Sequence, residues 1–178
     1  MQQVADGKTS GIRQIAGDQT FADRLRPLIE PGFRLALAML HDAQAAEDVV
    51  QEASFTAWRK VMGLRDQGRL RPWFLGVVAN KCRNARRVKW TAGVSIGLPE
   101  HLTVVSTEER SVRGADLRRA VAALGYDDRL VVVLHFYLDM PLEEIATISG
   151  KSVTATRARL YRAVQRLRPG VDVEEALR

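Results

Sequence analysis

Cysteine and histidine are scarce in this chain of 178 residues, which contains one cysteine, Cys82, and three histidines. One thiol can form neither an internal disulfide nor a cysteine-rich zinc site. His41, His101 and His135 lie far apart, and no cluster of histidine, aspartate and glutamate has the spacing of metal ligands. We therefore expect no metal, no cofactor and no clustered catalytic residues, which argues against an enzyme.

Long apolar runs are also missing from the sequence. No stretch reaches the roughly 18 residues needed to cross a membrane. Residues 1–20 are polar and contain no apolar signal core. The sequence therefore predicts no membrane insertion and a cytoplasmic protein.

The residues that are abundant indicate a packed protein with a polyanionic partner. Hydrophobic residues make up 46% of the chain, which is enough for a core. The formal net charge is +6 and the sequence pI is about 10.0. A basic balance of this size favours a polyanion, because binding releases counterions from phosphates. A generically basic protein is the alternative.

Apolar residues recur mostly at helical spacing, which predicts an all-α fold with two small helical domains. These are an N-terminal helical bundle and a C-terminal helix-turn-helix domain, joined by a flexible linker. Pro27 and Pro31 should bend or break the first helix, whereas Asp42 is suited to cap the second. The predicted segments are a flexible N-terminal tail (1–20), the first domain (21–88), the linker (89–113), the second domain (114–170) and a C-terminal tail (171–178).

The second predicted helix, at about 45–62, has an outer face that combines acids with an aromatic side chain. A helical wheel places on this face, opposite the core side, Asp48, Gln51, Glu52, Phe55 and Arg59. An aromatic anchor with a polar rim is typical of a protein interface, and the acids make this surface unsuited to DNA. The alternative is that Phe55 packs under a neighbouring helix of its own domain.

The third predicted helix, 72–88, has a basic outer face with a tryptophan at its head. The polar residues assigned to this face and its margins are Trp73, Asn80, Arg83, Asn84, Arg86 and Arg87. Arginine binds phosphate, asparagine can hold a base edge, and tryptophan can stack on an unpaired base. The combination favours single-stranded or locally opened DNA. The alternative is a solvated basic helix whose Trp73 is half-buried.

Residues 142–168 have the pattern of a helix-turn-helix. Gly150 suits the left-handed position of the turn, and Ser152 is the expected N-cap of the second helix. Outside its apolar stripe, that helix presents Arg157, Arg159, Tyr161, Arg162 and Arg166. Several arginines on one recognition helix suit guanine and phosphate contacts. A basic amphipathic helix in a plain bundle is the alternative.

These three patterns, in this order, resemble the sigma-70 family of RNA polymerase sigma factors, and most closely its extracytoplasmic function (ECF) subgroup. AEDVVQEASFTAWRK (46–60) resembles region 2.1–2.2, and WFLGVVANKCRNARR (73–87) resembles regions 2.3–2.4. Residues 117–168 resemble region 4. The resemblance implies a transcription initiation factor that binds core RNA polymerase and directs it to promoters.

The resemblance also implies roles for single residues and for partners. The first domain would bind the clamp helices of the polymerase largest subunit through Asp48, Gln51, Glu52 and Phe55. It would engage and melt the promoter −10 element through Trp73, Asn80, Arg83, Asn84, Arg86 and Arg87. The second domain would contact the flap of the beta subunit, and the −35 element through Arg157, Ala158, Arg159, Tyr161 and Arg162. An anti-sigma factor is the further partner that the resemblance implies.

Two departures from the family pattern limit what can be carried over. Many relatives have aspartate where this chain has Asn84, and many have a G-T-V-K-S-R run where this chain reads TATRAR at 154–159. The −35 sequence therefore cannot be inferred from relatives. The competing hypothesis is a stand-alone helix-turn-helix regulator that acts without being a polymerase subunit. It predicts tight duplex binding without polymerase.

Overall fold

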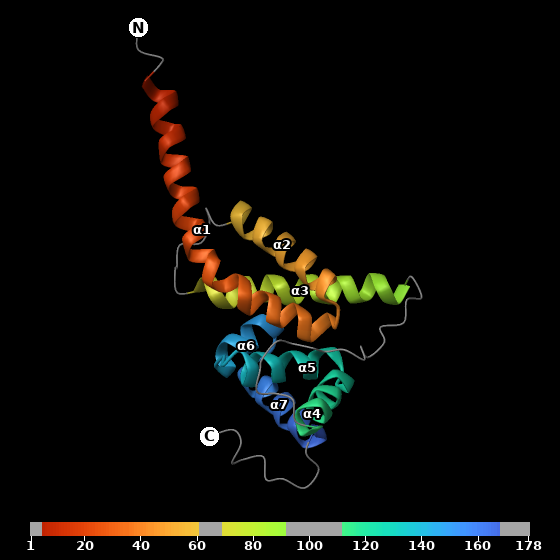
Figure 1. Cartoon of the computed structure of the whole chain (residues 1–178). Helices are drawn as coiled ribbons and strands as arrows, with labels where there is room; N and C mark the ends of the chain where they lie inside the picture. The colour runs from red at the N-terminus through yellow and green to blue at the C-terminus, as the bar shows by residue number, and fades with distance from the viewer. Residues whose placement is uncertain (1–4, 61–68, 92–111, 168–178) are drawn as a thin grey trace.

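The computed structural model describes residues 5–60, 69–91 and 112–167, and its side chains over 21–60, 69–88 and 117–167. All regular structure in these ranges is helical, which confirms the all-α prediction (Figure 1). The N-terminal helices are α1 (Ala5–Leu40), α2 (Ala43–Lys60) and α3 (Leu70–Thr91). The C-terminal elements are α4 (Val112–Ala123), α5 (Tyr126–Val132), the π-helical turn η3 (Val133–Tyr137), α6 (Leu142–Ser149) and α7 (Val153–Leu167).

Helix α1 is longer than the sequence pattern predicts. It begins at Ala5, inside the segment expected to be a tail, and contains both Pro27 and Pro31. No proline precedes Pro27, so nothing stops the helix from propagating backward from Phe21 at one hydrogen bond per residue. The prolines bend the helix without ending it, and the bend is visible in Figure 1.

Two local features shape the N-terminal bundle, which are the N-cap of α2 and the close approach of α1 to α3 at a glycine. Asp42 caps α2 as predicted, because its Oδ1 accepts a hydrogen bond of 3.0 Å from the Ala45 amide. Helix α1 lies so close to α3 that a Cβ added at Gly32 would fall 2.9 Å from Cε1 of Phe74, a fully buried ring. Glycine is therefore required at position 32 for these two helices to approach.

The C-terminal half contains the predicted helix-turn-helix. Gly150 ends α6 in the left-handed conformation, with φ 64°. The side chain of Ser152 caps α7 by accepting a hydrogen bond of 3.2 Å from the Ala155 amide. The β-branched run Val131–Val133 is helical and passes directly into η3, so it forms no strand.

The two halves pack against each other, which the sequence pattern did not predict. Helices α5 and α6 lie against α1 and α3 (Figure 1), and buried residues of both halves form one continuous core. A Cβ added at Gly76 of α3 would lie 3.7 Å from Cγ1 of Ile148 on α6. Most of the predicted linker, residues 92–111, and the predicted C-terminal tail lie outside the described residues. The linker's remaining ends belong to α3 and α4.

Candidate functional site

The outer face of α2 has the composition that the helical wheel predicts. The side chains of the core face are buried at Ala46, Val49, Val50, Ala53 and Ala57. Asp48, Gln51, Glu52 and Phe55 are all exposed, with Phe55 58% exposed. The alternative in which Phe55 packs under a helix of its own domain is therefore wrong.

Phe55 belongs to a small aromatic group on α2. Its ring centroid lies 6.0 Å from that of Trp58, which is also exposed, and the Arg59 guanidinium lies 5.7 Å from the Phe55 centroid. The sequence reasoning missed Trp58, although its spacing of three residues from Phe55 is the signal that would have found it. Glu52 makes a 2.9 Å ion pair with Lys81, which links the outer face of α2 to the neighbouring helix α3.

The basic face of α3 is divided into two stripes. Asn80, Asn84 and Arg87 follow one another at helical spacing and are exposed. Trp73, at the head of the helix, is half-buried and packs against the core. The exposed stripe therefore presents amide and guanidinium groups, while Trp73 shows only part of its ring.

The second stripe of α3 faces the C-terminal half of the chain. Tyr126 of α5 donates a 2.6 Å hydrogen bond from its hydroxyl to the Ala79 carbonyl. The guanidinium groups of Arg83 and Arg86 lie 5.1 Å and 5.4 Å from the centroid of the same tyrosine ring. Burial raises the pKa of the Tyr126 hydroxyl above its usual range. Two of the residues predicted to bind the −10 element are thus engaged by another part of the same chain.

The recognition helix α7 presents most of its predicted surface to solvent. Arg157, Ala158, Tyr161 and Arg162 are exposed, and the packing stripe beneath them is buried at Thr156, Leu160, Ala163 and Val164. Gln165 donates a 3.2 Å hydrogen bond to the Tyr161 hydroxyl, which orients that side chain along the helix.

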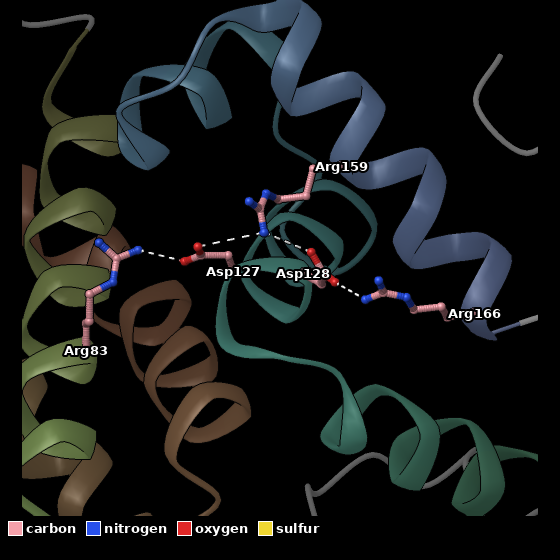
Figure 2. Close-up of polar contacts among 5 residues, drawn as sticks. All are labelled: Arg83, Asp127, Asp128, Arg159 and Arg166. Atoms are coloured by element: carbon pink, nitrogen blue, oxygen red, sulfur yellow. Dashed lines mark hydrogen bonds and ion pairs between the residues drawn. The ribbon is translucent and has the colours of Figure 1, made fainter. Parts of the chain in front are cut away.

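Arg159 differs from the other predicted residues of α7, because its guanidinium turns toward α5. Its Nη1 lies 2.9 Å from Asp128 Oδ1 and 3.7 Å from Asp127 Oδ2. Arg166, about two turns further along α7, also pairs with Asp128, and Arg83 of α3 pairs with Asp127 (Figure 2). The sequence reasoning did not single out these two aspartates.

A buried arginine lies next to the aspartates, at the contact between the two halves. Arg129 is 4% exposed and donates to the carbonyls of Ala122 and Leu124 in its own half. From the other half it reaches the Met39 carbonyl at 3.3 Å and His41 Nε2 at 2.6 Å. Charged side chains are rarely buried unless they are hydrogen-bonded, and here both terminal nitrogens of Arg129 are bonded, with carbonyls from both halves among their partners, while its buried Nε has no partner.

The electrostatics of this contact require a neutral histidine. Burial, assisted by the positive charges of Arg129 and Arg86, lowers the pKa of His41 to about 4. Burial lowers the pKa of Arg129 to about 10, so the guanidinium stays charged at neutral pH. A neutral imidazole nitrogen can accept the Arg129 hydrogen bond, whereas a protonated one cannot.

Among the residues that the structure describes, no group of three or more histidine, cysteine, aspartate and glutamate side chains is arranged to hold a metal ion. None of the described helices combines the length and apolarity of a membrane span. Cys82 is fully buried, and burial raises the pKa of its thiol to about 12.

Comparison with known proteins defines the class. Residues 21–91 match the family description Sigma-70 region 2, and residues 115–167 match Sigma-70, region 4. The ECF RNA polymerase sigma factor SigL of Mycobacterium tuberculosis is 31% identical, over 76% of this chain and 80% of that protein. The RNA polymerase sigma factor SigV of Bacillus subtilis is 28% identical, over 80% of this chain and 86% of SigV.

Solved structures share the same fold. The sigma factor RpoE of Bartonella quintana, solved in complex with the anti-sigma factor NepR, has a TM-score of 0.70 at 22% identity, covering 84% of this chain and 94% of RpoE. CnrH, solved with the cytosolic domain of CnrY, has a TM-score of 0.57 at 23% identity and covers 84% of each chain.

The chain is thus a helical protein of transcription initiation, built from two sigma-factor regions. It belongs to the sigma-70 family, within the ECF subgroup. Membership in this family makes RNA polymerase and promoter DNA its partners. The match to region 2 extends beyond the helix-turn-helix, so the hypothesis of a stand-alone regulator is not favoured.

Proposed function

We propose that this sigma factor docks on the clamp helices of the polymerase largest subunit through the outer face of α2. The observation that carries the proposal is the exposure of Phe55, which stands 58% exposed beside Asp48, Gln51 and Glu52. An aromatic ring left in water forgoes the free energy that burial of its apolar surface would give. The same ring in a partner's pocket gains that free energy and becomes a binding hot spot. The acids around it provide the polar rim.

We further propose that α3 engages the −10 element with the strands separated. Asn80, Asn84 and Arg87 form an exposed row along the helix, to which Arg83 and Arg86 would be added at its margin. Trp73 lies at the end of this row and offers part of its ring for stacking on a base. Capturing a base from the stack costs a few kcal/mol, which stacking and phosphate contacts offset. Asparagine at position 84 replaces the aspartate of many relatives, so it can donate as well as accept hydrogen bonds.

The recognition helix α7 is proposed to hold the −35 element as duplex DNA. Arg157, Ala158, Tyr161 and Arg162 are exposed on one side of α7, and the αL turn at Gly150 sets its angle to α6. Arg159 would join them only after leaving Asp128. The flap of the beta subunit is the proposed contact of this half with the polymerase.

An anti-sigma factor and a cytoplasmic location complete the proposal. RpoE and CnrH were each solved with a partner, NepR and the cytosolic domain of CnrY. By analogy, we expect a protein of this regulatory kind to bind the present chain. Its location follows from that of the polymerase and the chromosome on which it acts.

The test is association of purified core polymerase with the Phe55→Ala, Glu52→Ala double variant. Loss of a central aromatic anchor and its acidic neighbour should weaken binding by at least about 2 kcal/mol, because hot-spot residues carry such energies. Co-elution on size-exclusion chromatography measures it. The control is Glu47→Ala, which removes an exposed acid of α2 outside the proposed face. Unchanged co-elution of the double variant would refute the interface.

A further inference from the structure

Asp127 and Asp128, in the first turn of α5, pair with three arginines from two other helices. Asp127 Oδ1 lies 2.9 Å from Arg83 Nη2 of α3, and Asp127 Oδ2 lies 3.7 Å from Arg159 Nη1 of α7. Asp128 pairs with Arg159 at 2.9 Å and with Arg166. Figure 2 shows the two carboxylates between the arginines of α3 and α7.

The two arginines that Asp127 contacts come from different predicted DNA surfaces. Arg83 belongs to the proposed −10 surface and Arg159 to the proposed −35 surface, and both line the same open pocket as Asp127. A guanidinium binds a carboxylate and a phosphate through the same charge-assisted hydrogen bonds. The guanidinium donor that Asp127 occupies is therefore unavailable to a DNA phosphate.

The two aspartates differ in what they connect. Asp128 joins α5 to α7 within the C-terminal half, and its side chain is 14% exposed. Asp127 also reaches across to α3, and its side chain is 48% exposed, so a competing anion has access to it. Among the ion pairs of these two aspartates, the Asp127–Arg83 pair is therefore the one that connects the N-terminal half to the C-terminal half.

Two neighbours of Asp127 on α5, Tyr126 and Arg129, also bond to the N-terminal half. Tyr126 bonds the Ala79 carbonyl of α3, and Arg129 bonds the Met39 carbonyl and His41. Residues 126, 127 and 129 therefore all bind the N-terminal half. In this arrangement Gly76 and Ala79 of α3 face the C-terminal half, and Arg83, whose side chain is 50% exposed, lies at the edge of the contact.

We propose that Asp127 is an intramolecular stand-in for DNA phosphate: it holds Arg83 in the closed arrangement of the free chain, and DNA must displace it. The inference rests on the proposed function, because Arg83 matters here as a DNA-binding residue. The contact makes the free factor a weaker DNA ligand than its two basic surfaces would be if both were open.

The experiment measures DNA binding by the full chain without polymerase, using fluorescence anisotropy of a labelled mixed-sequence oligonucleotide, single-stranded and duplex. Asp127→Asn should tighten binding about two- to fivefold, the range expected for one exposed ion pair. The gain over the wild type should shrink as the salt concentration rises, because salt screens the exposed Asp127–Arg83 pair that competes with DNA. Asp127→Glu keeps the charge and should behave as the wild type.

Two controls separate this effect from a general gain in positive charge. Glu143→Gln makes the same charge change on an exposed residue of α6 that lies outside all three surfaces. In an Arg83→Gln background, Asp127→Asn should lose most of its effect, because the two residues act as a pair. Tightening equal to that of Glu143→Gln, or tightening that persists without Arg83, would overturn the proposal.

A third readout needs no DNA. Asp127→Asn should speed amide hydrogen exchange at the contact between α3 and α5, whereas Asp128→Asn should not, because its ion pairs stay within one half. Faster exchange without tighter DNA binding would overturn the competition with phosphate. The polymerase co-elution described above uses neither Asp127 nor Arg83, so failure of the proposed function is detected separately.

Discussion

The outer face of α2 and the basic face of α3 are neighbours in one bundle, yet they differ in what the rest of the chain does to them. On α2, Asp48, Gln51, Glu52 and Phe55 all remain exposed while the two halves are packed together. On α3, Arg83 and Arg86 contact Tyr126, and Arg83 also pairs with Asp127. The surface assigned to a protein partner is open, and the surface assigned to DNA is partly occupied.

This difference indicates an order of events. On the proposed surfaces, the polymerase docks without any rearrangement of the free factor, whereas DNA reaches the whole face of α3 only once α5 and α6 have left it. We therefore expect the halves to separate before DNA is fully bound, at the cost of the continuous core that they share.

The largest effect is expected from altering the proposed DNA face of α3 while leaving the outer face of α2 intact. Trp73→Ala should slow promoter opening about tenfold or more, because stacking on a base contributes about 1–3 kcal/mol. Initial binding to duplex promoter should change less. Permanganate footprinting of unpaired thymines measures the opening. Trp73 is half-buried, so Trp73→Phe, which keeps an aromatic ring, is the control for packing. Footprints identical to those of the wild type would remove Trp73 from melting.

A second prediction sharpens the contrast between Arg162 and Arg159 on α7. Arg162 is exposed, so Arg162→Ala should weaken binding at −35 directly, by about 1 kcal/mol or more. Arg159 is held by Asp128, so Arg159→Ala should lower the free energy of unfolding as well as affecting DNA binding. Band shifts of the holoenzyme on intact and scrambled −35 promoters distinguish base contacts from phosphate contacts. A loss that is equal on both promoters would show that Arg162 touches only phosphate.

A third prediction concerns the bundle that holds the two faces in place. Gly32→Ala forces a methyl group to within 2.9 Å of the buried Phe74 ring. Overpacking costs about 1–3 kcal/mol, and the better helix propensity of alanine returns up to about 1 kcal/mol. We therefore expect a net loss of about 1 kcal/mol in the free energy of unfolding.

Urea denaturation measures this loss, and Gly76→Ala is the matched control. Gly76 also lies inside a helix, and a Cβ added there meets Cγ1 of Ile148 at an ordinary contact distance of 3.7 Å. Alanine at position 76 should therefore leave the free energy of unfolding unchanged or raise it by up to about 1 kcal/mol. An equal cost for the two variants would contradict the close approach of α1 and α3.

A fourth prediction tests the contact between the halves by pH. His41 has a pKa of about 4 in the folded chain and about 6.5 when unfolded, so between these values the unfolded chain binds a proton that the folded chain does not. Stability should therefore be full above about pH 6.5 and fall as the pH drops toward about 4. His41→Gln should flatten this dependence, because glutamine accepts from Arg129 and does not titrate. Urea midpoints at neutral and mildly acidic pH measure it, with His135→Gln as the control. An unchanged pH dependence in His41→Gln would contradict the role of this histidine.

Local periodicity explains why much of the fold could be predicted. The core faces of α2 and α7, the Asp42 and Ser152 caps and the turn at Gly150 depend on residues within a few positions of one another. The exposed acidic-aromatic face follows from the same periodicity. The start of α1 was not predicted, because the helix begins at Ala5, within the segment expected to be a tail.

Contacts between distant residues explain what the sequence could not reveal. Arg83 and Asp127 are 44 positions apart, and Arg129 meets His41 across 88. No periodic pattern relates such positions, so neither the packing of the halves nor the pairing of Arg159 could be predicted from the sequence. The adjacent acids and arginine at 127–129 were present in the sequence, but their meaning depends on which helices they face.

The central claim is that this chain brings core RNA polymerase to specific promoters, and in vitro transcription tests it most directly. Purified core enzyme is assayed over a library of genomic promoter fragments, alone, with the chain, and with the Phe55→Ala, Glu52→Ala variant. We predict transcripts with defined start sites that appear only with the wild-type chain, and a shared pair of upstream elements among the selected fragments. Failure of the wild-type chain to associate with core enzyme or to direct any defined start, after removal of any co-purifying inhibitor, would contradict the account.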